Sequence, residues 1–158
     1  MRLCQVRILC YAVIVNLAFQ SGCGSKKPMT DKQNTYERTD VTGTWSNLSM
    51  TVTYQDRDSV FDVPEGKWQE ILKIKPILTT YSDDGSFESK YYGLNDSLLF
   101  TSSGSWSFSD DSLFLTSNGS TTSYKFEMNQ GVGEFTGILD WNEDGVATEI
   151  YSGRQRKH

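Results

Sequence analysis

The chain has 158 residues, with 15 basic and 20 acidic side chains and a formal net charge of -5, which is a size typical of one small domain. Its three cysteines are Cys4, Cys10 and Cys23, and its one histidine is the last residue, His158. Beyond Cys23 the chain therefore has no internal disulfide, no cysteine-based metal site and no histidine for a packed Ser/His/Asp triad.

The N-terminal residues 1–22 have the pattern of an export signal. Two arginines precede an apolar stretch that is too short to cross a bilayer comfortably as a permanent helix. The segment ends in Leu-Ala-Phe-Gln-Ser-Gly-Cys at residues 17–23, which resembles the lipobox of bacterial lipoproteins, with Gln20 in place of the usual aliphatic residue. The resemblance implies that Cys23 is acylated, by chains such as palmitate, and becomes the mature N-terminus. A plain secretory signal cut nearby and an uncleaved anchor are the alternatives.

An acylated Cys23 predicts attachment to a membrane of the cell envelope. Each buried methylene contributes about 0.8 kcal/mol, so several acyl chains would hold the domain almost permanently. By the same resemblance, Gly24 stands where many lipoproteins retained in the inner membrane have Asp, which favours the outer membrane. The basic pair Lys26 and Lys27 differs from the acidic surface-export signals of these bacteria, which favours the periplasmic face. Those two lysines either contact anionic head groups or are simply solvated. Nucleic acid is not an expected partner, because the chain is acidic and has no basic cluster interleaved with aromatic residues.

Composition divides the remainder into a tether and one domain. Residues 23–41 are mostly polar and show no sustained periodicity, which predicts a flexible tether. Residues 42–154 are rich in Ser, Thr, Gly and aromatic side chains, which favours short strands joined by tight turns. Residues 155–158 are interpreted as a C-terminal tail.

Alternation of apolar and polar side chains locates the strands. Pro76 forces an edge, bend or bulge in a long second strand, and the preceding residues 55–66 are expected to form a loop, with a helical turn at residues 65–72 as the alternative. Asn118 and Gly119 predict a type I′ turn because both tolerate positive φ. The expected strands are, in chain order, residues 43–54, 68–81, 86–92, 98–101, 104–109, 113–115, 123–128, 135–141 and 146–151.

Strands of this number and order predict an all-β fold. About eight consecutive antiparallel strands close well into an up-and-down barrel, which leaves no exposed edge for aggregation. A two-sheet sandwich is the alternative. The interior of an eight-stranded barrel either fills with side chains or holds one small ligand, and both outcomes stay open.

Three short motifs stand out in residues 42–154. They are Gly-Thr-Trp at residues 43–45, Asp-Gly-Ser-Phe at residues 84–87, and Gly-Ser-Trp at residues 104–106 followed by Asp-Ser-Leu-Phe-Leu at residues 111–115. With these motifs the domain resembles the lipocalin-like lipoproteins of Bacteroidetes-type bacteria, within the wider calycin group. The resemblance implies a barrel end closed by Gly43 and Trp45, with Arg154 packed over the indole as a cation–π contact. It also implies a monomeric, non-catalytic binding protein for a small hydrophobic or amphipathic ligand.

Aromatic side chains supply both a candidate ligand cavity and a candidate solid core. Inward-pointing aromatic residues line apolar pockets, but they equally fill dry interiors. A filled interior would instead favour an interaction or structural lipoprotein that contacts an envelope protein or glycan. The candidate cavity residues are Trp68, Trp106, Phe108, Tyr124, Phe126 and Phe135.

Carboxylates are the remaining candidates for metal binding or catalysis. Asp140, Asn142 and Asp144 match the start of a calcium loop, but the second half of that motif is missing, and a hairpin turn explains the same residues without an ion. Three paired carboxylates, at residues 83–84, 110–111 and 143–144, lie in expected turns and not around a pocket. We therefore expect no enzymatic activity and no cofactor, with weak calcium binding as the one candidate.

Overall fold

The computed structural model describes residues 35–158. The predictions on the export signal, on Cys23 and on most of the tether lie outside these residues.

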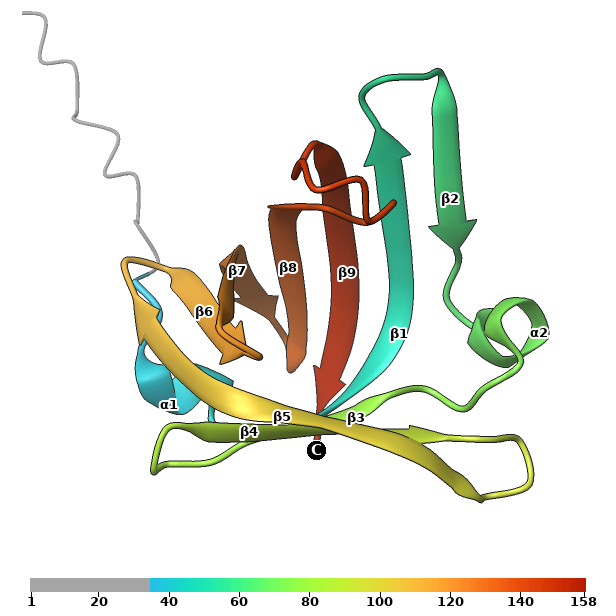
Figure 1. Cartoon of the computed structure of the whole chain (residues 1–158). Coiled ribbons are helices and arrows are strands. Elements are labelled where there is room, and N and C mark those ends of the chain that lie inside the picture. Colours follow the sequence, from blue (N-terminus) through green and yellow to red (C-terminus); the bar gives the residue numbers. More distant parts are fainter. Residues whose placement is uncertain (1–34) are drawn as a thin grey trace, which may run out of the picture. The chain divides into compact units, whose positions relative to one another are not determined.

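Two short helices and nine strands make up the described chain (Figure 1). Their bounds are α1 (Arg38–Val41), β1 (Gly43–Tyr54), β2 (Ser59–Val63), α2 (Trp68–Leu72), β3 (Leu78–Tyr81), β4 (Ser86–Tyr92), β5 (Leu98–Ser109), β6 (Ser112–Ser117), β7 (Ser120–Asn129), β8 (Val132–Leu139) and β9 (Glu149–Lys157). Neither helix is long and apolar enough to cross a membrane.

The strands form a closed antiparallel barrel. The sheet order is β2-β1-β3-β4-β5-β6-β7-β8-β9, and a further pairing of β1 with β9 closes it. Eight strands, β1 and β3 to β9, therefore surround the interior, and each pairs with its neighbour in antiparallel register. This confirms the predicted up-and-down barrel and rules out the two-sheet sandwich.

β1 is long enough to have two partners along one edge. Its first residues pair with β3, from Gly43 to Ser46, and its last residues pair with β2, from Met50 to Tyr54. β2 is thus a ninth strand that extends the wall at one end of the barrel. α2 follows it in the chain and contributes Trp68, of which only 3% is exposed, to the buried core.

The two ends of the barrel differ. At one end lie α1 and the β3–β4, β5–β6 and β7–β8 turns, and we call this the closed end (Figure 1). Tyr36 packs edge-on against Phe126 there, with ring centroids 5.3 Å apart, and its backbone N–H donates to Asp111 Oδ1 at 2.8 Å. The other end, which we call the open end, carries the β1–β2, β4–β5, β6–β7 and β8–β9 connections.

Five segments differ from the expectations for them. The two strands predicted at residues 98–101 and 104–109 are one continuous strand, β5. The predicted second strand at residues 68–81 is a helix followed by a short strand, so the helical alternative holds for its first part. The predicted loop at residues 55–66 contains β2, and the last strand runs to Lys157 and so includes most of the predicted tail. At the end of the predicted tether, Val41 is fully buried, because α1 packs on the closed end.

Candidate ligand cavity

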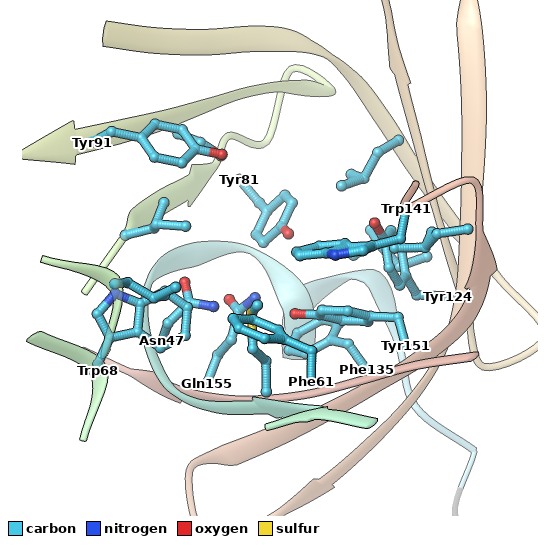
Figure 2. Close-up of a pocket in the computed structure, with 17 residues that line it drawn as sticks. Asn47, Phe61, Trp68, Tyr81, Tyr91, Tyr124, Phe135, Trp141, Tyr151 and Gln155 are labelled. Carbon is cyan, nitrogen blue, oxygen red and sulfur yellow. The ribbon is translucent and has the colours of Figure 1, made fainter. Parts of the chain in front are cut away.

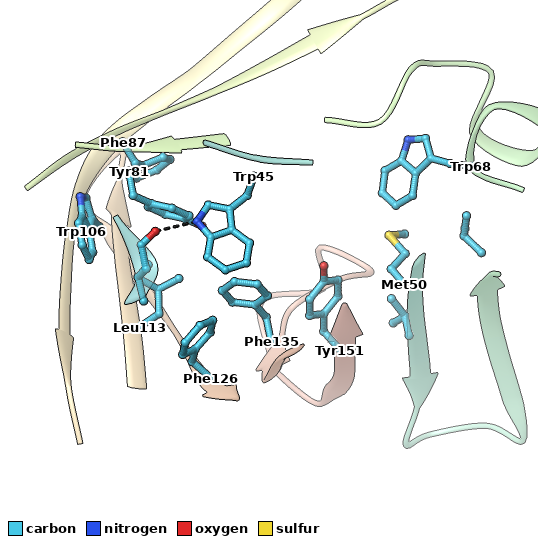
Figure 3. Close-up of a cluster of buried hydrophobic side chains, with 13 residues drawn as sticks. Trp45, Met50, Trp68, Tyr81, Phe87, Trp106, Leu113, Phe126, Phe135 and Tyr151 are labelled. Atoms are coloured by element: carbon cyan, nitrogen blue, oxygen red, sulfur yellow. Dashed lines mark hydrogen bonds between the residues drawn. The ribbon is translucent and has the colours of Figure 1, made fainter. Parts of the chain in front are cut away.

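The closed half of the barrel is filled by aromatic side chains (Figure 3). Trp45 is fully buried, its indole N–H donates to the Val41 carbonyl at 2.7 Å, and its ring lies edge-on to Phe126 and Phe135. Gly133 makes this packing possible, since a Cβ there would lie within 3 Å of the rings of all three aromatic residues. Large buried side chains therefore pack this half of the barrel.

The cation beside Trp45 is Lys157 and not Arg154. The Lys157 ammonium lies 5.6 Å from the indole centroid and donates to the backbone carbonyls of Thr39 and Asp40. Arg154 faces outward, because side chains alternate along β9, and it pairs with Glu65 at 3.0 Å. Gly43, at the start of β1, has a φ of +123°, and a Cβ there would lie 3.2 Å from the Lys157 side chain.

The open half of the barrel contains a cavity of about 380 Å³. Figure 2 shows the residues around it, and most of them are aromatic or aliphatic. They come from all of the strands except β5, from α2, and from the α2–β3 and β8–β9 connections. They are Asn47, Met50, Phe61, Trp68, Leu72, Ile77, Tyr81, Ser89, Tyr91, Leu113, Leu115, Tyr124, Phe135, Leu139, Trp141, Tyr151 and Gln155.

The structure separates the six predicted cavity residues into two groups. Trp68, Tyr124 and Phe135 line the cavity, and Phe135 also forms part of the closed-end core. Trp106, Phe108 and Phe126 belong to the closed-end core: Trp106 donates from its indole to the Ser82 carbonyl, and Phe108 packs edge-on against Phe126. These three point inward as predicted, but from the half of each strand that is nearer the closed end.

Two aromatic rings stand at the mouth of the cavity. Phe61 of β2 and Trp141 of the β8–β9 connection stack with centroids 6.2 Å apart, and 38% of Trp141 is exposed. Glu149, which is fully buried, fixes the Trp141 backbone, because its Oε2 accepts the Trp141 N–H at 3.0 Å. Its other oxygen accepts the Thr148 hydroxyl at 3.1 Å. A buried carboxylate thus holds the loop that carries Trp141.

Tyrosine hydroxyls are the main polar groups of the cavity wall. Burial raises the pKa of Tyr124 to about 12 and raises the pKa values of Tyr81, Tyr91 and Tyr151 above their ordinary value. All four side chains are therefore neutral at physiological pH, and their hydroxyls can both donate and accept.

The residues predicted to bind calcium bond to their own loop. Asp140 accepts the N–H groups of Asp144 and Gly145, and Asn142 Oδ1 also accepts the Asp144 N–H at 3.1 Å. Asp144 in turn accepts the Val146 N–H at 2.8 Å. The carboxylates therefore stabilise a tight turn. Within residues 35–158 no group of three or more His, Cys, Asp or Glu side chains is placed to hold a metal ion.

The paired carboxylates at two other turns also have structural partners. Asp84 Oδ1 accepts the backbone N–H and the hydroxyl of Ser86, which lowers the Asp84 pKa. Asp110 and Asp111 have positive φ values of 49° and 56° in the β5–β6 turn. Neither pair lines the cavity.

Comparison with known proteins gives a likeness in structure but none in sequence. No protein-family model matches the chain, and no curated protein matches it in sequence. Among solved structures, a lipocalin-like protein from Bacteroides uniformis ATCC 8492 aligns with 75% of this chain and 99% of its own, at 13% sequence identity and a TM-score of 0.46. The strand pairing alone establishes the barrel of this chain.

Proposed function

We propose that the protein is a non-catalytic, monomeric binding protein of the cell envelope that holds one small hydrophobic or amphipathic molecule in the open half of its barrel. The observation that carries the proposal is the cavity of about 380 Å³ with its largely apolar and aromatic wall. Ligand sites have volumes of roughly 300–1,000 Å³ and such walls, with a few polar groups that orient the ligand.

The contrast between the two halves of the barrel supports this proposal. The closed half is packed to the exclusion of solvent around Trp45 and Phe126, so the chain is able to fill its interior where it carries large side chains. In the open half the same strands leave space between aromatic rings. An apolar ligand there would remove its surface from water, at about 25 cal/mol per Å².

The position of the chain's first described residues fits a lipid anchor at Cys23. Tyr36 and α1 pack on the closed end, whereas Phe61 and Trp141 mark the mouth at the open end. A tether that joins the barrel at its closed end leaves the mouth free. We propose that this arrangement holds the protein at the outer membrane, on its periplasmic face.

The binding function is tested by filling the cavity. Leu115 lines it, and Leu99 is an exposed leucine of β5, with 53% of its surface accessible. We expect Leu115→Trp to weaken the binding of an environment-sensitive apolar dye at least tenfold and Leu99→Trp to leave it unchanged. Saturation at one dye per chain is expected for the unaltered protein. Equal affinity in both variants would contradict a site in the cavity.

The anchor is tested separately by the mass of the N-terminus. In detergent extracts of the producing cells we expect a peptide that begins with acylated Cys23, and a Cys23→Ala variant that is released from the membrane. An unmodified, soluble product of the natural sequence would contradict the anchor without affecting the cavity.

A second candidate function is favoured by one exposed surface. The β4–β5 connection and the start of β5 carry Leu94, Leu98, Leu99 and Phe100, each more than half exposed. A segment with this many exposed apolar side chains is typical of a protein interaction site. Contact with an envelope protein is tested by placing a photo-crosslinking residue at position 99, with position 121 on β7 as control; discrete crosslinks at 99 alone are expected if this candidate is correct.

A further inference from the structure

The inner wall of the cavity carries a pair of amides from neighbouring strands. Asn47 of β1 and Gln155 of β9 are direct cross-strand partners, and both line the cavity (Figure 2). Only 6% of Asn47 is exposed. Gln155 Oε1 is buried and has no hydrogen-bond partner among residues 35–158. A buried carbonyl without a partner is costly, and a ligand that donates a hydrogen bond to it would remove that cost.

The rest of the polar wall is uncharged. Ser89 bonds to Thr79, with 2.8 Å between their hydroxyl oxygens, and Figure 2 shows the hydroxyls of Tyr91 and Tyr151 directed towards the cavity. Among residues 35–158, no Asp, Glu, Lys, Arg or His lines the cavity. The wall therefore provides hydrogen-bond donors and acceptors but no countercharge for an ion.

Basic residues near this site along the chain are engaged elsewhere. Arg154, next to Gln155 in β9, pairs with Glu65 and Glu134 on the outside of the barrel. Lys157 bonds to α1 carbonyls at the closed end. At the mouth, the connection of residues 140–148 has three carboxylates and no basic side chain. An anion would meet negative charge at the mouth and no cation inside.

We infer that the cavity selects an uncharged ligand with an apolar body and a hydroxyl or amide donor, which bonds to Gln155 Oε1, and that it rejects the ionised carboxylic acid of the same length. An ion moved from water into a wall without a countercharge loses its hydration with no replacement. The inference rests on the proposed function and specifies the ligand class of that site.

Three probes that share a ten-carbon chain test the inference. They are 1-decanol, which donates a hydrogen bond; methyl decanoate, an uncharged methyl ester without a donor; and decanoate, which is ionised at neutral pH. Each is titrated against the bound dye on the full chain carrying Cys23→Ala, so that detergent is kept out of the assay. We expect decanol to bind most tightly, with decanoate at least tenfold weaker.

Gln155→Met keeps the length of the side chain and removes its hydrogen-bonding groups. We expect it to weaken decanol about tenfold, the loss of one hydrogen bond, and to leave methyl decanoate unchanged. Gln69→Met, on the exposed surface of α2, is the matched control and should change neither. Near-ultraviolet circular dichroism verifies that both variants are folded.

The outcomes separate the two claims. Equal binding of decanoate and decanol, or an undiminished decanol preference in Gln155→Met, would overturn the inference while the binding function stands. If neither the dye nor any probe binds to the folded chain, both the inference and the proposed function fail.

Discussion

Truncation of Phe126 is the most direct test of the packing in the closed half of the barrel. Its side chain is fully buried, and its ring contacts those of Tyr36, Trp45, Phe108 and Phe135 with centroids 5.1–6.0 Å apart. Truncation of a phenylalanine in such a site costs about 3–5 kcal/mol, because the transfer free energy is lost and a cavity remains. We therefore expect Phe126→Ala to lower the free energy of unfolding by about that amount and the Tm by about 10–20 °C.

Phe100 is the matched control for this experiment. It stacks on Tyr91 at 3.9 Å between centroids, but 55% of its surface is exposed. We expect Phe100→Ala to cost about 1 kcal/mol or less. Urea denaturation of both variants measures the difference in the free energy of unfolding. If Phe126→Ala does not fold, Phe126→Leu replaces it, and we expect that variant to lower the free energy of unfolding by roughly 1.5 kcal/mol. A loss below about 1 kcal/mol for Phe126→Ala would refute the packed closed end.

Three further predictions concern pH, the sheet and the mouth. Burial raises the pKa of Tyr124 to about 12 and also raises the pKa values of Tyr81 and Tyr151, so the unfolded chain loses these protons first as the pH rises above 10. We therefore expect the free energy of unfolding to be unaffected below pH 10 and to fall above it by about 1.4 kcal/mol per pH unit for each tyrosine. Urea midpoints and tyrosinate absorbance measure this, and a folded state whose tyrosines all ionise near pH 10 would contradict it. Gly104→Ala places a Cβ 2.0 Å from the Thr116 carbonyl oxygen of the paired strand, so we expect a loss of about 1–3 kcal/mol in thermal unfolding, and an unchanged Tm would show that the two strands are not this close. Glu149→Ala removes the acceptor of the Trp141 N–H, so hydrogen exchange at that amide should accelerate, whereas Asp144→Ala should leave it protected; the reverse order would exclude Glu149 as the group that fixes the mouth.

Alternation along the strands made most of the barrel predictable. β1 begins and ends where its pattern predicts, and β4 does so as well. The Asn118-Gly119 turn has positive φ at both residues, 52° and 81°, as its composition predicts. Local pattern and turn chemistry were sufficient there because each strand has one dry face.

The errors lie where local pattern is ambiguous. At α2, apolar residues spaced for a helix also fit a strand. The helix ends at Leu72, and its C-cap residue Lys73 takes a left-handed backbone with φ of 59°. β2 has five residues and follows a charged turn, so it resembles a loop. In β9 the outward Arg154 and Arg156 resemble a tail, although Gln155 between them points inward.

The site was only partly predictable because a cavity depends on register. Inward-facing aromatic residues are recognisable from alternation, but Phe126 and Tyr124 are two residues apart on β7 and lie in opposite halves of the barrel. Which half a residue occupies follows from the pairing of β1 with β9, a contact between the two ends of the domain. No short-range signal specifies Phe61, Ile77 or Gln155 as neighbours.

Native mass spectrometry of the protein extracted from its own cells is the most direct test of whether the barrel holds a ligand in its open half. We expect one uncharged small molecule per chain, which remains with the Leu99→Trp variant and is absent from Leu115→Trp. An empty protein in every preparation, or a molecule that persists in Leu115→Trp, would contradict it.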